Sequence, residues 1–275
     1  QYYCNNFLET VDRALEARID WERFSVTRGE HTTYVKPFPI SVAPAFVDDP
    51  PRVSRAELLR KLGITAEFLG VGVERIDYTK GLPERIRALR FFFETYPEYR
   101  ERLVFVQLAA PSRGMIDRYQ EIQREVEDRV REINQAFQTK SWRPILYLKA
   151  HHEHRDIWAY YRHADFCMVT SLHDGMNLVA KEFVSVRDDE DGALILSRFA
   201  GASHELRDAL IVNPYDLAGM AEAVRAALEM PPEERRARMI RMRHSVIDHN
   251  IYRWAGLLLS ELARIPVETT GAKAS

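Results

Sequence analysis

The sequence predicts an α/β domain built on a doubly wound parallel sheet. From residue 68 onward, six short apolar runs alternate with longer amphipathic stretches, which is the order of strands and helices in such a domain. The apolar runs are nearly continuous, as expected of strands that helices cover on both faces. The chain has 275 residues and is 46% hydrophobic, which is enough for a large core. We therefore expect a Rossmann-like sheet.

The individual elements follow from these runs and from the turn residues between them. We predict strands at residues 68–76, 103–109, 145–148, 166–170, 193–197 and 209–213. Helices are predicted at residues 83–96, 114–138, 155–163, 176–187, 202–207 and 217–230, and two more close the chain at 232–249 and 251–265. The polar tail from residue 266 should fray.

The amino-terminal part has a different pattern. Helical spacing predicts a helix at 5–18, and polar residues predict a loop at 19–34 with a turn at 28–30. The prolines of 34–42 allow only an edge strand there. Residues 44–54 resemble a linker, and Ser54 should cap a helix at 55–62 that Gly63 ends. We therefore divide the chain into an amino-terminal part (1–50), a main domain (51–249) and a closing helix with its tail (250–275).

Composition argues against several classes of protein. The chain has 39 Lys and Arg against 41 Asp and Glu, a net charge of −2, whereas non-specific nucleic-acid binders carry a basic excess. No apolar run approaches the roughly 18 residues of a membrane span. Two distant cysteines, Cys4 and Cys167, build no disulfide framework, which favours a reducing cytoplasm. Because the chain opens at Gln1, we expect a fragment or a processed product.

Three familiar catalytic motifs do not occur. The sequence has no Gly-x-Gly-x-x-Gly after a predicted strand, no P-loop and no Gly-x-Ser-x-Gly elbow. Their absence argues against a dinucleotide dehydrogenase, a P-loop kinase and an α/β-hydrolase.

One strand-turn-helix junction is a candidate anion site. The apolar run at 166–169 leads into a polar turn with Asp174 and Gly175 at its apex, and the next helix is predicted to begin near Met176. The unpaired N–H groups of a helix start can bind phosphate. Asp174 before the helix and Glu182, two turns inside it, suit the hydroxyl groups of a nucleotide sugar. The alternative is an ordinary junction of the kind that every α/β domain contains.

Cations follow two other predicted strands, at the edge of the sheet where ligands of such folds bind. Arg75 and Lys80 follow the strand at 68–76 and would stabilise a diphosphate where no metal does so. Alternatively, Arg75 pairs with Glu74 or Asp77 on the surface. Arg113 precedes a predicted helix and either binds a second phosphate or is a plain surface arginine.

Three histidines, His151, His152 and His154, follow the strand at 145–148. They lie in a predicted loop, and no other cluster of His or carboxylates completes a metal site with sensible spacing. A loop whose backbone contacts a base is the better interpretation. The small residues at 198–202 follow another strand and would let a ligand approach a helix start.

Several long motifs together resemble one enzyme family. They are Val73–Arg85 (VERIDYTKGLPER), Gln107–Gly114 (QLAAPSRG), Asp174–Glu182 (DGMNLVAKE), Ser197–Ala202 (SRFAGA) and Ile211–Pro214 (IVNP). In this order, within residues 34–264, they resemble the trehalose-6-phosphate synthases, retaining glycosyltransferases of family 20. The resemblance implies the GT-B fold, in which two Rossmann-like domains face each other across the active site. It implies transfer of glucose from UDP-glucose to glucose 6-phosphate with retention, and no metal or other cofactor.

The same resemblance implies roles for the candidate residues. Arg75 and Lys80 match the family's pair on the donor diphosphate, and Asp174 matches the acid at the hydroxyls of the transferred glucose. Glu182 matches the acid on the ribose hydroxyls. The backbone that holds sugar and phosphate corresponds to Gly175, Met176, Asn177, Leu178 and Val179.

Two further correspondences concern the acceptor and the base. Arg113 matches a residue that grips the acceptor phosphate, and His152 lies where backbone groups of the family's loop meet the uracil. The last helix resembles the one that crosses back to the family's amino-terminal domain.

The sequence also departs from the family pattern. The amino-terminal acceptor domain should precede this chain, and residues 1–45 resemble only its final helix and strand. We therefore expect this chain alone to bind the donor without transferring glucose. His173 stands where bacterial relatives often have arginine.

Other functions remain open at this point. One is a related transferase with another acceptor, of the glucosylglycerol-phosphate or validoxylamine type, and another is a non-catalytic nucleotide-sugar-binding module. The base of the donor and the oligomeric state, monomer or homo-oligomer, are also open. We expect neither nucleic acid nor a membrane as a partner.

Overall fold

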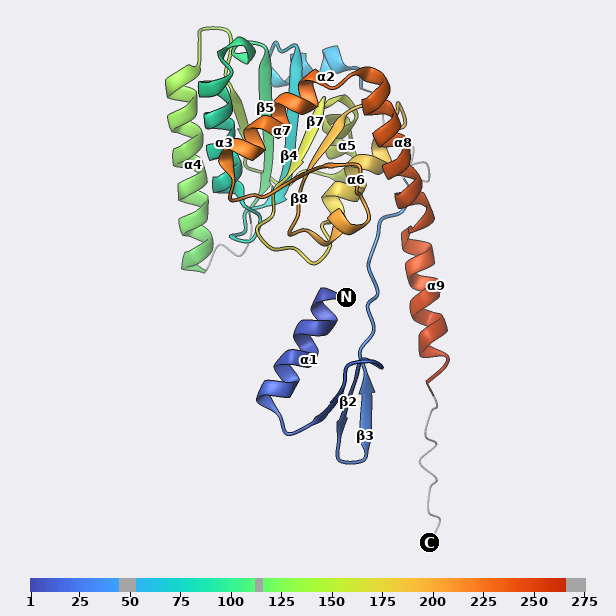
Figure 1. The fold of residues 1–275 in the computed structure, drawn as a ribbon. Helices are drawn as coiled ribbons and strands as arrows, with labels where there is room; N and C mark the ends of the chain where they lie inside the picture. Colours follow the sequence, from blue (N-terminus) through green and yellow to red (C-terminus); the bar gives the residue numbers. More distant parts are fainter. Residues whose placement is uncertain (45–52, 112–115, 266–275) are drawn as a thin grey trace. The chain divides into compact units, whose positions relative to one another are not determined.

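The structure is a computed structural model that describes residues 1–44, 53–111 and 116–265 (Figure 1). The chain divides into two compact units, one formed by residues 41–250 and the other by residues 1–40 together with 251–275. Among the described residues, no helix is long and apolar enough to cross a membrane.

The larger unit is organised around a parallel sheet with six strands in the described part of the chain. The strands are β4 (Phe68–Arg75), β5 (Leu103–Ala110), β6 (Ile145–Leu148), β7 (Phe166–Val169), β8 (Ala193–Ser197) and β9 (Leu210–Val212). They lie in the order β6-β5-β4-β7-β8-β9. The chain thus winds outward from β4 in one direction and then from β7 in the other. This confirms the predicted doubly wound fold and places its switch point between β4 and β7.

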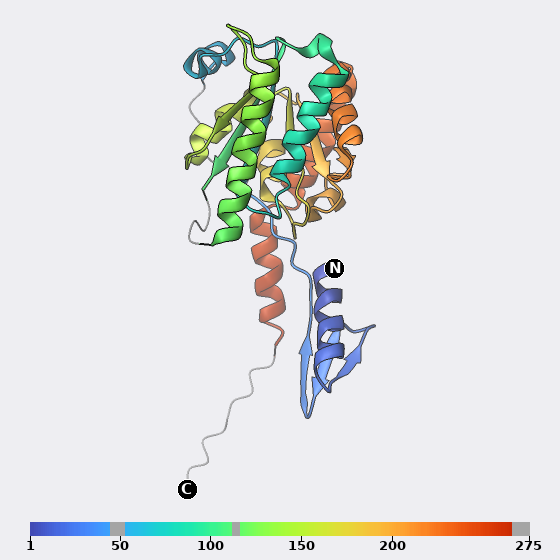
Figure 2. The same ribbon diagram turned by 90° about the vertical axis from the view of Figure 1, so that its left-hand side faces the viewer.

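Helices cover both faces of this sheet (Figures 1 and 2). On one face lie α3 (Leu82–Thr95), α4 (Asp117–Phe137) and α7 (Leu217–Glu229), and on the other α5 (His154–His163) and α6 (Leu178–Val186). Two more helices pack on the second layer, α2 (Arg55–Leu62) on α5 and α8 (Pro232–Asp248) on α6. The central strands are therefore buried on both faces, and Val71, Phe105 and Phe166 have no exposed surface. Their burial explains why they read as unbroken apolar runs.

The smaller unit contains α1 (Tyr2–Ala14), α9 (Ile251–Leu262) and an antiparallel sheet of β1 (Arg18–Asp20), β2 (Ser25–Arg28) and β3 (His31–Tyr34). The predicted loop at 19–34 was therefore wrong, although its turn is present and Gly29 has a φ of 61°. The predicted strand at 34–42 is absent as well, since β3 ends at Tyr34 and residues 35–44 form no regular structure. The small strands escaped prediction because every residue of β3 is exposed, so no apolar alternation marks it.

Other boundaries in the larger unit were predicted closely. Ser54 caps α2 in a capping box with Glu57, and Gly63 ends it in the left-handed conformation. The predicted helix at 202–207 is instead a short 3-10 turn, η3 (Gly201–His204). The start predicted for the helix after β5 falls within residues 112–115, outside the described residues, and α4 is described from Asp117.

Candidate functional site

The candidate site lies at the switch point of the sheet, where the loops after β4 and β7 meet. Leu172 N donates to Thr79 O at 2.8 Å and His173 N to the same oxygen at 3.3 Å, so the two loops are joined through their backbones. Gly81 sits at this junction with a φ of 65°, and a Cβ there would lie 2.2 Å from Thr170 O. Only glycine tolerates both the backbone angle and the close approach.

The structure brings Lys80 and Asp174 together across this junction. Lys80 Nζ lies 2.6 Å from Asp174 Oδ2, and the same oxygen accepts from Asn177 Nδ2 at 2.9 Å and from Ser171 Oγ at 3.4 Å. Burial lowers the pKa of Lys80, but the carboxylates of Glu74 and Asp174 outweigh it and leave the pKa raised. Lys80 therefore stays protonated, and it lies where the loops after β4 and β7 meet.

The turn after Asp174 ends in a strained helix cap. Asn177 has a φ of 77°, which is uncommon for a residue other than glycine, and its side chain accepts from Ala180 N at 3.1 Å. The helix thus begins at Leu178, two residues later than the predicted start at Met176. Since the first N–H groups of a helix have no intrahelical acceptor, those at the start of α6 suit an anion.

A second loop, after β8, holds the Asp174 turn in place. Asp174 N donates to Phe199 O at 3.2 Å, Gly201 N donates to Asp174 O at 3.0 Å, and Ala202 N donates to Met176 O at 2.7 Å. The small residues of this loop were predicted to admit a ligand. In the structure their small size lets one backbone lie against another, which fixes the turn.

Glu182 lies on the same helix, closer to its start than predicted. It is the fifth residue of α6, just over one turn from the cap at Asn177. Burial raises the pKa of Glu182, and the charge of His154 and the Tyr161 hydroxyl, which donates at 3.4 Å, oppose the rise only in part. A half-buried carboxylate at this place is a suitable acceptor for hydroxyl groups of a ligand.

Arg75 ends β4 with its side chain exposed. Among the described residues Arg75 forms no ion pair with Glu74 or Asp77, although its charge helps to lower the pKa of Asp77. Glu74 instead faces Arg85 at 3.3 Å, and Asp77 accepts from Thr79 N and Thr79 Oγ1, both at 2.9 Å. Arg75 is thus a cation that the described part of the chain leaves without an ion pair, beside the charged Lys80.

His152, another predicted site residue, is not joined to this cluster within the described residues. His152 is half-buried, and its Nε2 has no hydrogen-bond partner within the described residues. Arg113 lies outside the described residues. Among those that are described, no group of three or more His, Cys, Asp and Glu side chains could hold a metal ion.

Sequence reasoning missed a buried polar network directly beneath the site. Arg85, with no exposed surface, donates to Thr170 Oγ1 and to Gln107 Oε1, both at 2.9 Å, and to Glu74 Oε1 at 3.3 Å. The other carboxylate oxygen of Glu74 lies 4.0 Å from Lys80 Nζ. The sequence does contain an indication of this network: Gln107 interrupts an apolar strand, and Arg85 lies on the apolar face of its helix. Polar residues at such positions need buried hydrogen-bond partners.

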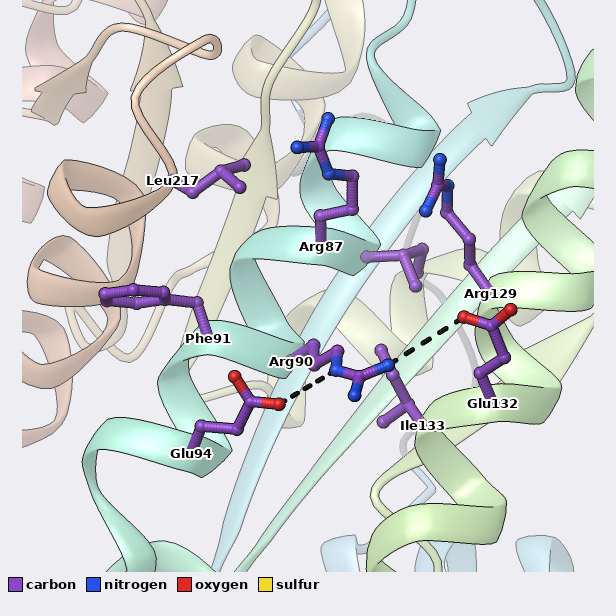
Figure 3. A pocket seen from close by; sticks show the side chains of 9 residues that line it. Arg87, Arg90, Phe91, Glu94, Arg129, Glu132, Ile133 and Leu217 are labelled. Carbon is purple, nitrogen blue, oxygen red and sulfur yellow. Dashed lines mark hydrogen bonds and ion pairs between the residues drawn. The ribbon is translucent and has the colours of Figure 1, made fainter.

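A separate cavity of about 210 Å³ lies between α3 and α4 (Figure 3). Its arginines are mostly paired: Arg90 bridges to Glu94 at 2.9 Å and to Glu132 at 3.8 Å, and Arg129 bridges to Glu125 at 2.7 Å. None of the predicted site residues that the structure describes lines it. Because its lining residues all belong to α3, α4 and α7, this cavity lies away from the carboxyl ends of the strands, where ligands of such folds bind.

The sequence matches the family described as glycosyltransferase family 20 over residues 1–264. A trehalose-6-phosphate synthase of Sodalis glossinidius (strain morsitans) is 44% identical over 197 residues, which are 71% of this chain and 42% of the relative. One from Cronobacter sakazakii is 39% identical over 246 residues, 86% of this chain and 52% of the relative. The chain therefore spans about half the length of these curated relatives.

Solved structures of similar proteins match the fold. An α,α-trehalose-phosphate synthase (UDP-forming) from Burkholderia xenovorans, described in complex with glucose-6-phosphate, superposes with a TM-score of 0.88 at 36% identity and covers 94% of this chain and 58% of that chain. An E. coli structure described as bound with UDP-2-fluoro glucose gives 0.86 at 34% identity, with 94% and 58% covered. The likeness thus extends over nearly the whole chain.

Proposed function

This chain belongs to glycosyltransferase family 20, and we propose that it forms the donor-binding part of a retaining glucosyltransferase. The proposed reaction moves glucose from UDP-glucose to glucose 6-phosphate and gives trehalose 6-phosphate. Support comes from the curated relatives, which are trehalose-6-phosphate synthases, and from solved relatives described with glucose-6-phosphate and with a UDP-glucose analogue. Because the chain spans about half of those relatives, we propose that transfer also needs the remainder of their length.

The observation that carries this proposal is the 2.6 Å contact between Lys80 and Asp174. It puts a cation and a carboxylate side by side at the switch point, next to the first N–H groups of α6, of which Ala180 N is bonded to the Asn177 side chain. A nucleotide sugar needs this combination, because its diphosphate is anionic while its sugar offers hydroxyl donors.

Each site residue has a proposed role. Arg75 and Lys80 bind the donor diphosphate, and Asp174 accepts from hydroxyls of the glucose. The backbone of residues 175–179 holds sugar and phosphate, and Glu182 accepts from the ribose. We assign the acceptor phosphate to Arg113 and the uracil to the loop at His152, on the family resemblance alone.

The proposed chemistry takes place on one face of the sugar. As the bond from the anomeric carbon to the diphosphate breaks, negative charge grows on the departing phosphate, and Arg75 and Lys80 stabilise it. The departing phosphate oxygen takes the proton from the acceptor hydroxyl, which then bonds to the same face of the anomeric carbon, so the configuration is retained. No metal is needed for these steps, because the two cations supply the positive charge.

Two wider assignments belong to the same proposal. We place the reaction in the cytoplasm, where the two buried free thiols, Cys4 and Cys167, would stay reduced. We also propose that residues 1–50 and 250–275 belong with the acceptor side of the enzyme, and residues 51–249 with the donor.

Calorimetry with UDP tests the donor site directly. The chain should bind UDP, and Lys80→Gln should weaken binding at least tenfold, since charged hydrogen bonds contribute about 1.5–3 kcal/mol each. Lys61→Gln is the matched control, because Lys61 is exposed in the last turn of α2, which precedes the amino-terminal end of β4 rather than the carboxyl end where the site lies, and it should leave the affinity unchanged. Absence of UDP binding by the wild-type chain would contradict the proposal.

A turnover assay then separates the possible acceptors. With the amino-terminal domain of a relative added, UDP-glucose and glucose 6-phosphate should yield UDP and trehalose 6-phosphate. Transfer only to glycerol 3-phosphate would indicate a glucosylglycerol-phosphate synthase. UDP binding without transfer to any acceptor would indicate a binding module.

A further inference from the structure

Four charged side chains form a row of alternating sign from the core of the larger unit to the candidate site. Arg85 lies deepest, Glu74 is next at 3.3 Å, Lys80 follows at 4.0 Å, and Asp174 ends the row at 2.6 Å from Lys80. Arg85 has no exposed surface and Glu74 has 5%. These two residues therefore cannot touch a ligand, yet they belong to the same chain of charges as two residues that can.

Arg85 is held so that one of its nitrogens faces Glu74. Gln107 donates its amide N–H groups to Gly72 O at 3.1 Å and Leu108 O at 3.0 Å, which leaves its oxygen for Arg85. The hydroxyl of Thr170 accepts from Arg85 Nε at 2.9 Å. A guanidinium stays protonated even when buried, so it needs a negative partner. Within the described residues, Glu74 is the carboxylate bonded to it.

The distances show how this pairing affects Lys80. Glu74 turns one oxygen to Arg85 and stays 4.0 Å from Lys80 Nζ, while Asp174 approaches the same nitrogen to 2.6 Å. Arg85 neutralises Glu74, so the four side chains together carry no net charge. Lys80 then stays next to Asp174 at the candidate site. Without Arg85, the buried carboxylate would have Lys80 as its nearest cation and would draw it inward, away from an incoming anion.

We propose that Arg85 is a positioning residue for the donor diphosphate: it neutralises Glu74 so that the ammonium group of Lys80 remains available to Asp174 and to the phosphate. The inference rests on the proposed donor site and adds a residue that acts on the ligand only through Lys80.

Charge compensation tests the inference. Arg85→Met removes the cation and should weaken UDP binding at least tenfold at pH 7, measured by calorimetry. Arg85→Met combined with Glu74→Gln removes both charges and should return the affinity to within about threefold of the wild type. If Arg85→Met is not folded by circular dichroism, Arg85→Gln replaces it, because an amide can still bond Gln107 and Thr170.

Arg187→Met is the matched control for loss of a buried arginine. Arg187 is 3% exposed and pairs with Asp189 at 2.9 Å, so its loss should lower the melting temperature but keep UDP affinity within twofold. A purely structural role of Arg85 would give the same result as this control. The inference is overturned if folded Arg85→Met or Arg85→Gln binds UDP like the wild type, or if the double variant folds but stays tenfold weaker. A wild-type chain that binds no UDP overturns the proposed function itself, and the inference with it.

Discussion

Replacing Gly201 with alanine tests how the turn at Asp174 is held. A Cβ atom at residue 201 would lie 2.0 Å from the carbonyl oxygen of Gly175. A carbon–oxygen contact needs about 3.3 Å, so the two backbones must move apart by roughly 1 Å. That movement would stretch the hydrogen bonds from Gly201 N to Asp174 O, now 3.0 Å, and from Ala202 N to Met176 O, now 2.7 Å.

The expected loss of stability follows from these two bonds. A buried N–H that loses its acceptor costs about 1–3 kcal/mol, so we expect the free energy of unfolding to fall by about 2–4 kcal/mol. For a unit of this size, that corresponds to a melting temperature lower by about 5–15 °C. The same movement displaces the backbone at Gly175, and displacements near 1 Å cost on the order of 100-fold in catalysis. UDP affinity should therefore fall at least about tenfold.

Urea unfolding followed by circular dichroism, together with UDP calorimetry, measures both effects. Gly256→Ala is the control, since a Cβ there meets no atom within 4 Å and the residue lies inside helix α9. It should stabilise the chain by about 0.5–1 kcal/mol and leave UDP binding unchanged. The reasoning is refuted if Gly201→Ala unfolds within about 0.5 kcal/mol of the wild type and binds UDP normally.

Two further predictions use the charges around α6. Burial raises the pKa of Glu182, so the folded chain keeps that proton to a higher pH than the unfolded chain, and stability falls as the pH rises between the two pKa values. Glu182→Gln should thus raise the melting temperature at pH 8 but not at pH 4, while weakening UDP binding; an equal rise at both pH values would contradict this. Lys181 and Lys149 each form an ion pair at 2.8 Å, with Glu205 and Glu127, but their side chains are 1% and 40% exposed. Lys181→Met should cost about 3 kcal/mol in urea unfolding and Lys149→Met less than about 1 kcal/mol; similar losses would show that burial does not decide the difference.

The large sheet could be predicted from sequence because burial on both faces leaves a local mark. All six of its strands were located with ends correct to within one residue, since each is an apolar run bounded by turn residues. Strands β1 to β3 carry no such mark. Every residue of β3 is exposed, and Ser25 is the one buried residue of β1 and β2, so no apolar run marks these strands. Strand prediction from hydrophobicity fails where pairing does not bury side chains.

The candidate site likewise has features that follow from the local sequence and contacts that depend on residues far apart in the chain. That Lys80 and Asp174 would lie at one edge of the sheet follows from the rule that parallel strands end together. That they form an ion pair does not follow, because it depends on loops that are 94 residues apart in sequence. The partner of Glu74 illustrates the same limit. The sequence offers Arg75 next to it and Lys80 nearby, yet neighbouring residues of a strand point to opposite faces. Arg75 therefore points outward, while Glu74 points inward to Arg85. Because Arg75 cannot reach Glu74, its guanidinium stays available for a ligand.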